Sequence, residues 1–226
     1  MKPDPLNDAK ILDSWHKNAQ PWTRAVRNRE IDSRRQVTDA AIVNAVLSRS
    51  PASVLDIGCG EGWLARELSA QNIRVTGIDA VAELVEQANN AGGGDFHVLP
   101  YEQLAAGDSG LMADLVVCNF SMIGKESCEV LFKVMHSLLH PGGSWVVQTL
   151  HPVTSCGELP YADGWRTGSW AGFSSEFTDP APWYFRTLQS WVDLFNGSGF
   201  RLREIREPIH PHTQQPVSVI FIAEPD

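Results

Sequence analysis

The feature that most constrains this chain of 226 residues is the stretch at positions 54–62, which reads VLDIGCGEG. An apolar run typical of a strand ends near Asp56 and enters a turn with glycine at every second position, and a helical pattern begins at Trp63. Because glycine has no Cβ, such a turn lets the backbone approach a polar ligand closely at the N-terminus of a helix. The stretch therefore predicts a strand, a tight ligand-binding turn and a helix.

Strand and helix patterns alternate from residue 51 to residue 150. Such alternation predicts βαβ units with right-handed crossovers, and hence a mostly parallel sheet covered by helices on both faces. The expected strands are 53–57, 74–79, 96–99, 115–120 and 144–150, and the expected helices are 63–70, 82–90 and 126–139. Two further strands, 200–207 and 217–223, have no helix between them and are expected to pair antiparallel. The fold class is thus α/β, doubly wound and Rossmann-like.

The N-terminal residues 1–50 are expected to form a helical cap. Asn7 or Asp8 can cap a first helix, which Pro21 is expected to interrupt, and a second helix should begin near Thr38. This segment is rich in arginine, with Arg24, Arg27, Arg29, Arg34 and Arg35. Two interpretations stay open: a solvated cap over the sheet, or a lid whose arginines and tryptophans contact an anionic group of a ligand.

Residues 151–185 break the alternation and carry several aromatic side chains. A long aperiodic segment in a compact domain is usually a disordered loop or a cover over an active site, and the aromatic content favours the cover. We therefore expect one domain over residues 1–226. Its parts are a cap (1–50), a cofactor-binding core (51–150), a substrate lid (151–185) and a C-terminal helix with a β-hairpin (186–226).

Composition limits the classes of partner. The formal charge of −9 disfavours nucleic acid. The chain has no apolar run of the roughly 20 residues that span a bilayer, and residues 1–5 lack the apolar segment of a signal peptide. A cytoplasmic protein without a membrane partner is expected. The four cysteines have no metal-ligand spacing, so no metal is expected. The oligomeric state is not indicated.

Asp79 ends the second expected strand, 19 positions after Gly60. A carboxylate at this distance from a glycine turn accepts hydrogen bonds from ribose hydroxyls, although Asp79 could instead cap the helix that follows. The third glycine comes one residue earlier than in a pyrophosphate-binding turn, and Asp56 and Glu61 would repel phosphate. These acids suit a cationic ligand, which favours S-adenosylmethionine over a nicotinamide cofactor.

The stretch VLDIGCGEG resembles the first motif of class I S-adenosylmethionine-dependent methyltransferases. Four further segments match this family in the expected order: TGID at 76–79, LPYEQL at 99–104, DLVVCNF at 114–120 and LHPGG at 139–143. The resemblance is strong over residues 50–150 and weak over the last forty. It implies a seven-stranded sheet whose last strand is antiparallel, and S-adenosylmethionine as the cofactor, with S-adenosylhomocysteine as the product.

Ten positions match cofactor contacts of the family. The resemblance implies that the backbone at 58–60 passes the methionine part, that Asp56 reaches its amino group and that Asp79 binds the ribose. Tyr101 and Glu102 would meet the adenine edge, although Pro100 replaces an aspartate that many relatives carry. The full set is Asp56, Gly58, Cys59, Gly60, Asp79, Ala80 (against adenine), Tyr101, Glu102, Asn119 and Phe120 (both under the sulfonium).

The acceptor side is less defined. In-line methyl transfer depends mainly on alignment and exclusion of water, and a general base is needed only where the acceptor must lose a proton. His151 is a candidate base, or else a turn residue before Pro152. Arg186 could pair with a substrate acid or support the helix from Thr187. A pocket for a flat small molecule is expected from Trp165, Trp170, Trp183 and Tyr184.

We therefore predict a methyltransferase acting on a small molecule, with the acceptor atom left open. One alternative is a protein of the same fold that binds S-adenosylmethionine or a derivative without turning it over. An NAD-dependent oxidoreductase is a less favoured third interpretation.

Overall fold

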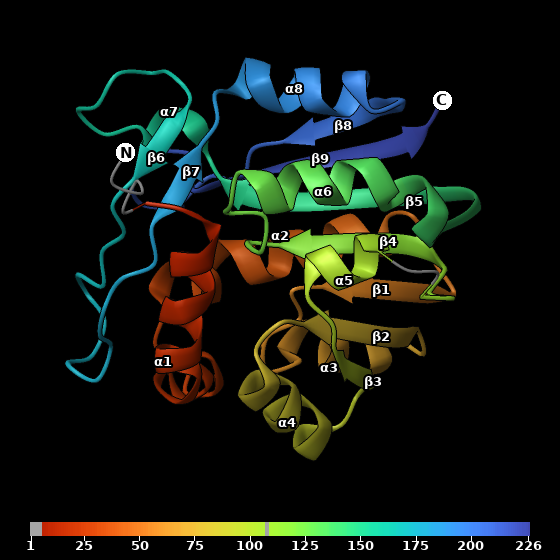
Figure 1. Cartoon of the computed structure of the whole chain (residues 1–226), viewed down its shortest axis with the longest axis horizontal. Coiled ribbons are helices and arrows are strands. Elements are labelled where there is room, and N and C mark those ends of the chain that lie inside the picture. Colours follow the sequence, from red (N-terminus) through yellow and green to blue (C-terminus); the bar gives the residue numbers. More distant parts are fainter. Residues whose placement is uncertain (1–5, 107–108) are drawn as a thin grey trace.

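A seven-stranded sheet forms the centre of the structure, a computed structural model that describes residues 6–106 and 109–226 (Figure 1). The expectation about residues 1–5 lies outside this part of the chain. The strand order is β3-β2-β1-β4-β5-β9-β8, and β9 is antiparallel to both of its neighbours. This confirms the predicted mostly parallel sheet and its C-terminal hairpin. The strands are β1 Ser53–Ile57, β2 Arg74–Asp79, β3 Asp95–Val98, β4 Ala113–Asn119, β5 Leu139–Leu150, β8 Phe200–Arg206 and β9 Ser218–Pro225.

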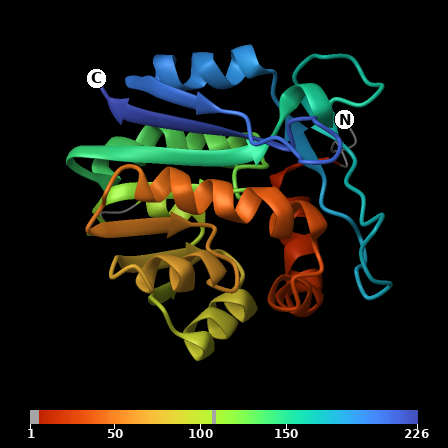
Figure 2. The ribbon, with the colours of Figure 1, turned by 180° about the vertical axis from the view of Figure 1, so that it is seen from behind.

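Helices cover both faces of the sheet, as Figures 1 and 2 show from opposite sides. Because side chains alternate along a strand, each strand contributes to both cores. Leu55 packs with the helices of one face, whereas its neighbour Val54 packs with those of the other. The first face carries α5 Tyr101–Ala106, α6 Glu126–Val134 and α8 Leu188–Gly197; the second carries α2 Asp39–Leu47, α3 Trp63–Ser69 and α4 Ala82–Ala91.

The first helix, α1, runs without a break from Asp8 to Arg27, and Asn7 caps it by accepting a hydrogen bond from the Lys10 N–H. The predicted interruption at Pro21 is therefore wrong. Proline removes one helical hydrogen bond, but Pro21 lies on the buried face of α1, so tertiary packing holds the helix together. A π-helical turn, η1 Arg34–Thr38, leads directly into α2.

The segment from α6 to β5 differs in detail from its prediction. The helix ends at Val134 instead of continuing to residue 139, and a 3₁₀ turn, η2 Met135–Leu138, follows it. β5 then begins at Leu139, five residues before the predicted start. A shift in the pairing register between β4 and β5 accommodates the Pro-Gly-Gly sequence that had been expected to form a turn.

Residues 151–185 contain a short helix, α7 Pro152–Ser155, and two short strands, β6 Gly164–Arg166 and β7 Trp183–Phe185, which pair antiparallel. The loop between these strands runs beside α1 (Figures 1 and 2). Asn18 of α1 fastens it by two hydrogen bonds to the backbone of Thr178.

The sheet order reverses between β1 and β4, which are parallel neighbours. Ligands of open α/β sheets bind where the strand order reverses, beyond the carboxyl ends of the strands. The glycine turn follows β1 at this place, and α1 stands across from it (Figure 1).

In the described residues, no helix has both the length and the apolar character needed to cross a membrane.

Candidate functional site

The glycine turn after β1 adopts a left-handed backbone at Gly58, Gly60 and Gly62, with φ angles of 76°, 57° and 81°. A Cβ at Gly58 would lie 2.2 Å from the Cβ of Ser121, so this glycine permits close packing on the loop after β4. A Cβ at Gly60 would meet only the Trp22 Nε1, at 3.9 Å, among the residues described. Gly60 therefore leaves an open backbone surface, as a turn that holds a ligand requires.

The N–H groups at the front of the turn are already engaged. Those of Gly58 and Cys59 donate to the carbonyl of Ile78 at 2.7 and 3.0 Å. The N–H of Gly60 donates to Asp79 Oδ2 at 2.9 Å. The turn is therefore hydrogen-bonded to the end of β2, and these three N–H groups are not available to bind a phosphate.

Asp79 fixes two pieces of backbone at the end of β2. Besides Gly60, it accepts a hydrogen bond at Oδ1 from the N–H of Val81, which precedes α4. Burial raises the pKa of this carboxyl, while the backbone hydrogen bonds oppose the rise. A carboxylate has about four acceptor sites and the backbone N–H groups of Gly60, Val81 and Ala80 do not fill them all, so support of α4 and acceptance of a ribose hydroxyl are compatible roles for one side chain.

Asp56 lies behind the turn, outside the described residues that line the cavity. It is 2% exposed, and burial, with a smaller contribution from Asp79, raises its pKa to about 7. The same burial raises the pKa of the Cys59 thiol well above its ordinary value, so this thiol stays protonated.

Glu61 has a fully buried side chain that pairs with two arginines. Arg27 Nε lies 2.8 Å from Oε2, and Arg66 Nη2 lies 2.5 Å from Oε1. The interpretation that this acid favours a cationic ligand is therefore wrong, because its charge is compensated inside the protein. Of the two acids beside the turn, only Asp56 has no ionic partner among the described residues.

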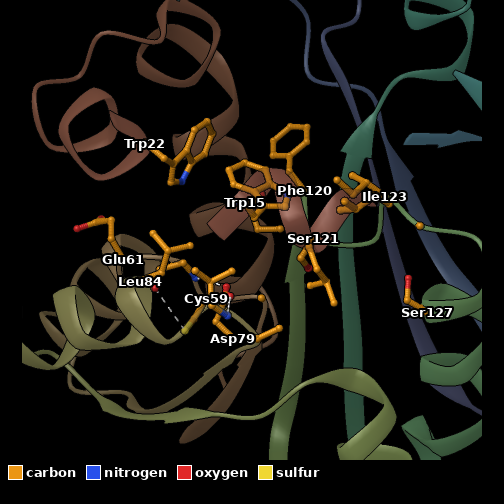
Figure 3. Close-up of a pocket in the computed structure, with 18 of the residues that line it drawn as sticks. Trp15, Trp22, Cys59, Glu61, Asp79, Leu84, Phe120, Ser121, Ile123 and Ser127 are labelled. Carbon is orange, nitrogen blue, oxygen red and sulfur yellow. Dashed lines mark hydrogen bonds between the residues drawn. The ribbon is translucent and has the colours of Figure 1, made fainter. Parts of the chain in front are cut away.

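A cavity of about 440 Å³ lies between the turn and α1. In Figure 3, Trp15 and Trp22 of α1 lie across it from Cys59 and Asp79. Nine of the ten predicted cofactor positions line it: Gly58, Cys59, Gly60, Asp79, Ala80, Tyr101, Glu102, Asn119 and Phe120.

The end of β4 forms one border of this cavity. Asn119 is oriented by Gln148, whose Nε2 donates to its Oδ1 at 2.7 Å. Phe120 has a φ of 54°, a conformation that bulky residues rarely adopt, and its N–H donates to the carbonyl of Gln148. Strain of this kind is commonly retained where it positions a side chain for function.

Two buried polar atoms on the cavity wall were not singled out by the sequence. Arg34 Nη2 and Thr38 Oγ1 have no hydrogen-bond partner among the described residues, and both residues line the cavity. The Arg34 Nε binds Asp39 at 2.9 Å, and its guanidinium lies 4.7 Å from the Trp63 ring. Buried polar groups are usually satisfied, so these two atoms, which lie just beneath the cavity surface, are exceptions among the described residues.

The cover over the cavity joins α1 to the loop between β6 and β7. Trp15 packs edge-to-face on Trp22 and Trp170, with centroids 5.1 and 6.0 Å apart. Ser14 donates to the carbonyl of Asp179, and Lys17 pairs with the carboxylate of the same residue. The N-terminal segment and the aromatic loop thus form one cover.

The five predicted substrate residues are not brought together at the cavity. Trp170 lines the cavity, whereas Trp165, Trp183, Tyr184 and Arg186 lie outside the lining formed by the described residues. Trp165 packs on Tyr184 across β6 and β7. Arg186 is buried, donates to the carbonyls of Gly124 and Lys125, and lies 5.2 Å from the Trp191 ring of α8. This placement favours its interpretation as support for α8.

His151 is 3% exposed and also lies apart from the described cavity lining. Its Nε2 lies 2.7 Å from Glu207 Oε1, and its Nδ1 accepts a hydrogen bond from the N–H of Val153. With both ring nitrogens engaged at the start of α7, the placement favours the turn-residue interpretation over a general base.

A seven-stranded sheet of this order, with a glycine turn after β1 and an acid after β2, defines the fold of class I S-adenosylmethionine-dependent methyltransferases. A family described as a methyltransferase domain matches residues 29–205, and the chain belongs to this family. The resemblance seen in the sequence is thereby confirmed.

Two curated relatives are similar over part of their length. The chain is 34% identical over 114 residues to the ubiquinone biosynthesis O-methyltransferase of Xanthomonas axonopodis pv. citri (strain 306), covering 48% of this chain and 47% of the relative. It is 32% identical over 104 residues to the enzyme of the same name from Acinetobacter baumannii (strain AYE), covering 43% and 44%. The chain thus spans just under half of each.

Two solved structures share the fold. An S-adenosylmethionine-dependent methyltransferase from Mesorhizobium loti has a TM-score of 0.61 at 20% identity, covering 80% of this chain and 95% of that protein. The DhpI–SAM–HEP complex has a TM-score of 0.67 at 16% identity, covering 99% and 100%. At such identities the likeness concerns the fold alone.

Proposed function

We propose that this chain is an S-adenosylmethionine-dependent methyltransferase that acts on a small-molecule acceptor by in-line transfer. The observation that carries this proposal is the way Asp79 closes the glycine turn. Its carboxylate takes the N–H of Gly60 and lies on the cavity wall beside the open surface of that glycine. A turn closed in this way has no free donors at 58–60 for a pyrophosphate, which disfavours a nicotinamide cofactor.

The residues on the wall fit the parts of S-adenosylmethionine. Arg34 and Thr38 line the cavity and carry unpartnered donors, which a side-chain rotation would turn toward its carboxylate. Asp56 lies outside the described lining; a bound ammonium would favour its ionised carboxylate and could reach it directly or through water. Asp79 has acceptors for the ribose hydroxyls. Ala80, Tyr101 and Glu102 line the part of the cavity assigned to adenine.

When bound, S-adenosylmethionine supplies an electrophilic methyl group on a sulfonium. Catalysis by the protein then consists of holding and aligning the reactants and excluding water. The aromatic cover formed by Trp15, Trp22 and Trp170 performs the exclusion, and Asn119 and Phe120 form the wall where the acceptor meets the donor. The curated relatives are O-methyltransferases of ubiquinone biosynthesis, which supports a small-molecule acceptor here.

Incubation with methyl-labelled S-adenosylmethionine and a panel of phenols, amines and quinones tests this proposal. We expect label in an extractable product and an equal amount of S-adenosylhomocysteine. An Asp79→Ala control should transfer label more slowly at a cofactor concentration below saturation. Tight cofactor binding with no labelled product from any acceptor would favour the alternative of a non-catalytic binding protein.

A further inference from the structure

Besides the cofactor positions, the cavity lining includes a set of apolar side chains with a different chemistry. We call this part the acceptor region and define it by six side chains. They come from α1, from the loop between β6 and β7, from the loop after β4 and from the end of β5: Leu12, Trp15, Trp170, Phe173, Ile123 and Leu150. Figure 3 shows Trp15 and Ile123 bordering this side of the cavity. All six are apolar, and Leu150 keeps 41% of its surface exposed.

The Asp8 carboxylate lies close to Leu12 in the sequence and already accepts hydrogen bonds from the backbone. Asp8, at the start of α1, accepts the N–H of Lys125 at 2.9 Å and the N–H of Ser127 at 2.6 Å. These N–H groups lie at the N-terminus of α6, where the helix dipole favours a negative charge. Asp8 is therefore used to fasten α1 to α6.

The other charged side chains of the cavity lie elsewhere or are paired. Glu61 is bound by two arginines, and Asp79 is held by the turn. Glu102 follows Tyr101 in the first turn of α5, on the cofactor wall, and Arg34 lies against Trp63 at the start of α3. Apart from the Asp8 carboxylate, which two N–H groups already hold, the acceptor region offers a charged ligand no ionic partner among the described residues, so desolvating such a ligand there is costly.

We infer that the acceptor is an uncharged molecule with a flat, apolar body, and that Leu12 and Trp15 are residues that determine this specificity. The inference rests on the proposed function. Burial of an apolar ring against these side chains is favourable, and a neutral polar tip can stay at the sulfonium end of the region.

The aromatic rings could in principle hold a cationic acceptor instead. Their packing disfavours that role. Trp15 meets Trp22 and Trp170 at interplanar angles of 80°, and Phe173 meets Trp170 at 74°. In each edge-to-face pair the edge of one ring covers one face of its neighbour, which leaves fewer free ring faces to surround an ammonium.

Three probes with one body and different charge test the inference: 4-methylbenzyl alcohol, 4-methylbenzoate and 4-methylbenzylammonium. Their binding is measured at pH 7 by ligand-observed NMR with the protein saturated by S-adenosylhomocysteine. We expect the alcohol to bind about ten-fold more tightly than either ion. Trp15→Ala should weaken binding of the alcohol. Leu12→Lys should shift the preference toward the benzoate, whereas the control Leu12→Met should leave the order unchanged.

Two failures are distinguished by calorimetry on the same samples. If S-adenosylhomocysteine does not bind, the proposed function itself fails. If it binds, but either ion binds as tightly as the alcohol, the inference of an uncharged acceptor is overturned and the methyltransferase proposal stands. Failure of all three probes to bind the cofactor-loaded protein overturns the inference as well, because the apolar body is common to them.

Discussion

Replacing Gly60 by alanine tests whether the cofactor lies against the glycine turn. The added methyl would meet only Trp22 Nε1, at 3.9 Å, among the described residues, so it would project into the cavity without a clash inside the protein. The backbone at Gly60 has a φ of 57°, and alanine in this left-handed conformation costs about 1 kcal/mol of stability. We therefore expect a folded and slightly destabilised protein.

The expected loss of binding is larger than this backbone effect. A methyl group inserted into a close contact costs about 1–3 kcal/mol, which corresponds to roughly a ten-fold to hundred-fold loss of affinity for S-adenosylhomocysteine. Gly142→Ala is the matched control, because Gly142 has a φ of 80° and free space around its Cβ position but lies in β5, away from the cavity.

Calorimetry measures the binding of both variants, and thermal unfolding measures their stability. The two variants should lose similar stability, but only Gly60→Ala should lose affinity. Equal affinity of the two variants would refute the placement of the cofactor on this turn. The placement would also be refuted if both variants lost affinity in proportion to their loss of stability.

Three further predictions concern the surroundings of the turn. Glu61→Gln should lower the free energy of unfolding by about 3 kcal/mol, since it leaves two arginines without their buried partner. The control is Glu176→Gln, which breaks an exposed pair with Arg24. A loss of stability in Glu61→Gln no greater than in this control would contradict the prediction. The pKa of Asp56 in the folded protein is about 7, above the ordinary value of 3.8, so its contribution to stability is present below pH 4 and is lost as pH rises through 7. Denaturation of the ligand-free protein across this range should therefore find Asp56→Asn increasingly more stable than wild type, by on the order of 4 kcal/mol above pH 7; a difference independent of pH would show that Asp56 titrates normally. Asn18→Ala removes two hydrogen bonds to Thr178, so amide exchange in the loop 167–182 should accelerate, and unchanged exchange would mean that ring packing alone holds the cover.

Much of the fold follows from local patterns in the chain. The alternation of apolar strands and amphipathic helices predicted β1 to β5 in order, because each buried strand must be covered on both faces. The short connection at 208–217 predicted the antiparallel pairing of β8 and β9, because a parallel crossover needs more chain. The nine wall positions from Gly58 to Phe120 were predicted from the resemblance to the methyltransferase family, and they share one wall because they follow strand ends that meet at one edge of the sheet.

The remaining parts of the site depend on tertiary structure. Pro21 stays inside α1 because the helix buries that face, which its helix propensity does not reveal. The sequence offered five arginines in the N-terminal segment and did not show which of them would reach the cavity. Arg34 lies on the cavity wall because it begins the π-helical turn before α2. Trp165 and Trp183 belong to the same aromatic segment as Trp170, so the sequence did not separate them. The pairing of β6 with β7 places them away from the cavity that Trp170 lines.

The most direct test of the proposed function is calorimetry of the wild-type protein against S-adenosylmethionine, S-adenosylhomocysteine and NAD, repeated on Asp79→Ala. We predict that the wild type binds the first two and not NAD. The variant, which loses the acceptor for the ribose hydroxyls, should bind S-adenosylhomocysteine about ten-fold or more weakly. Binding of NAD alone, or unchanged affinity in a folded Asp79→Ala variant, would contradict the proposal.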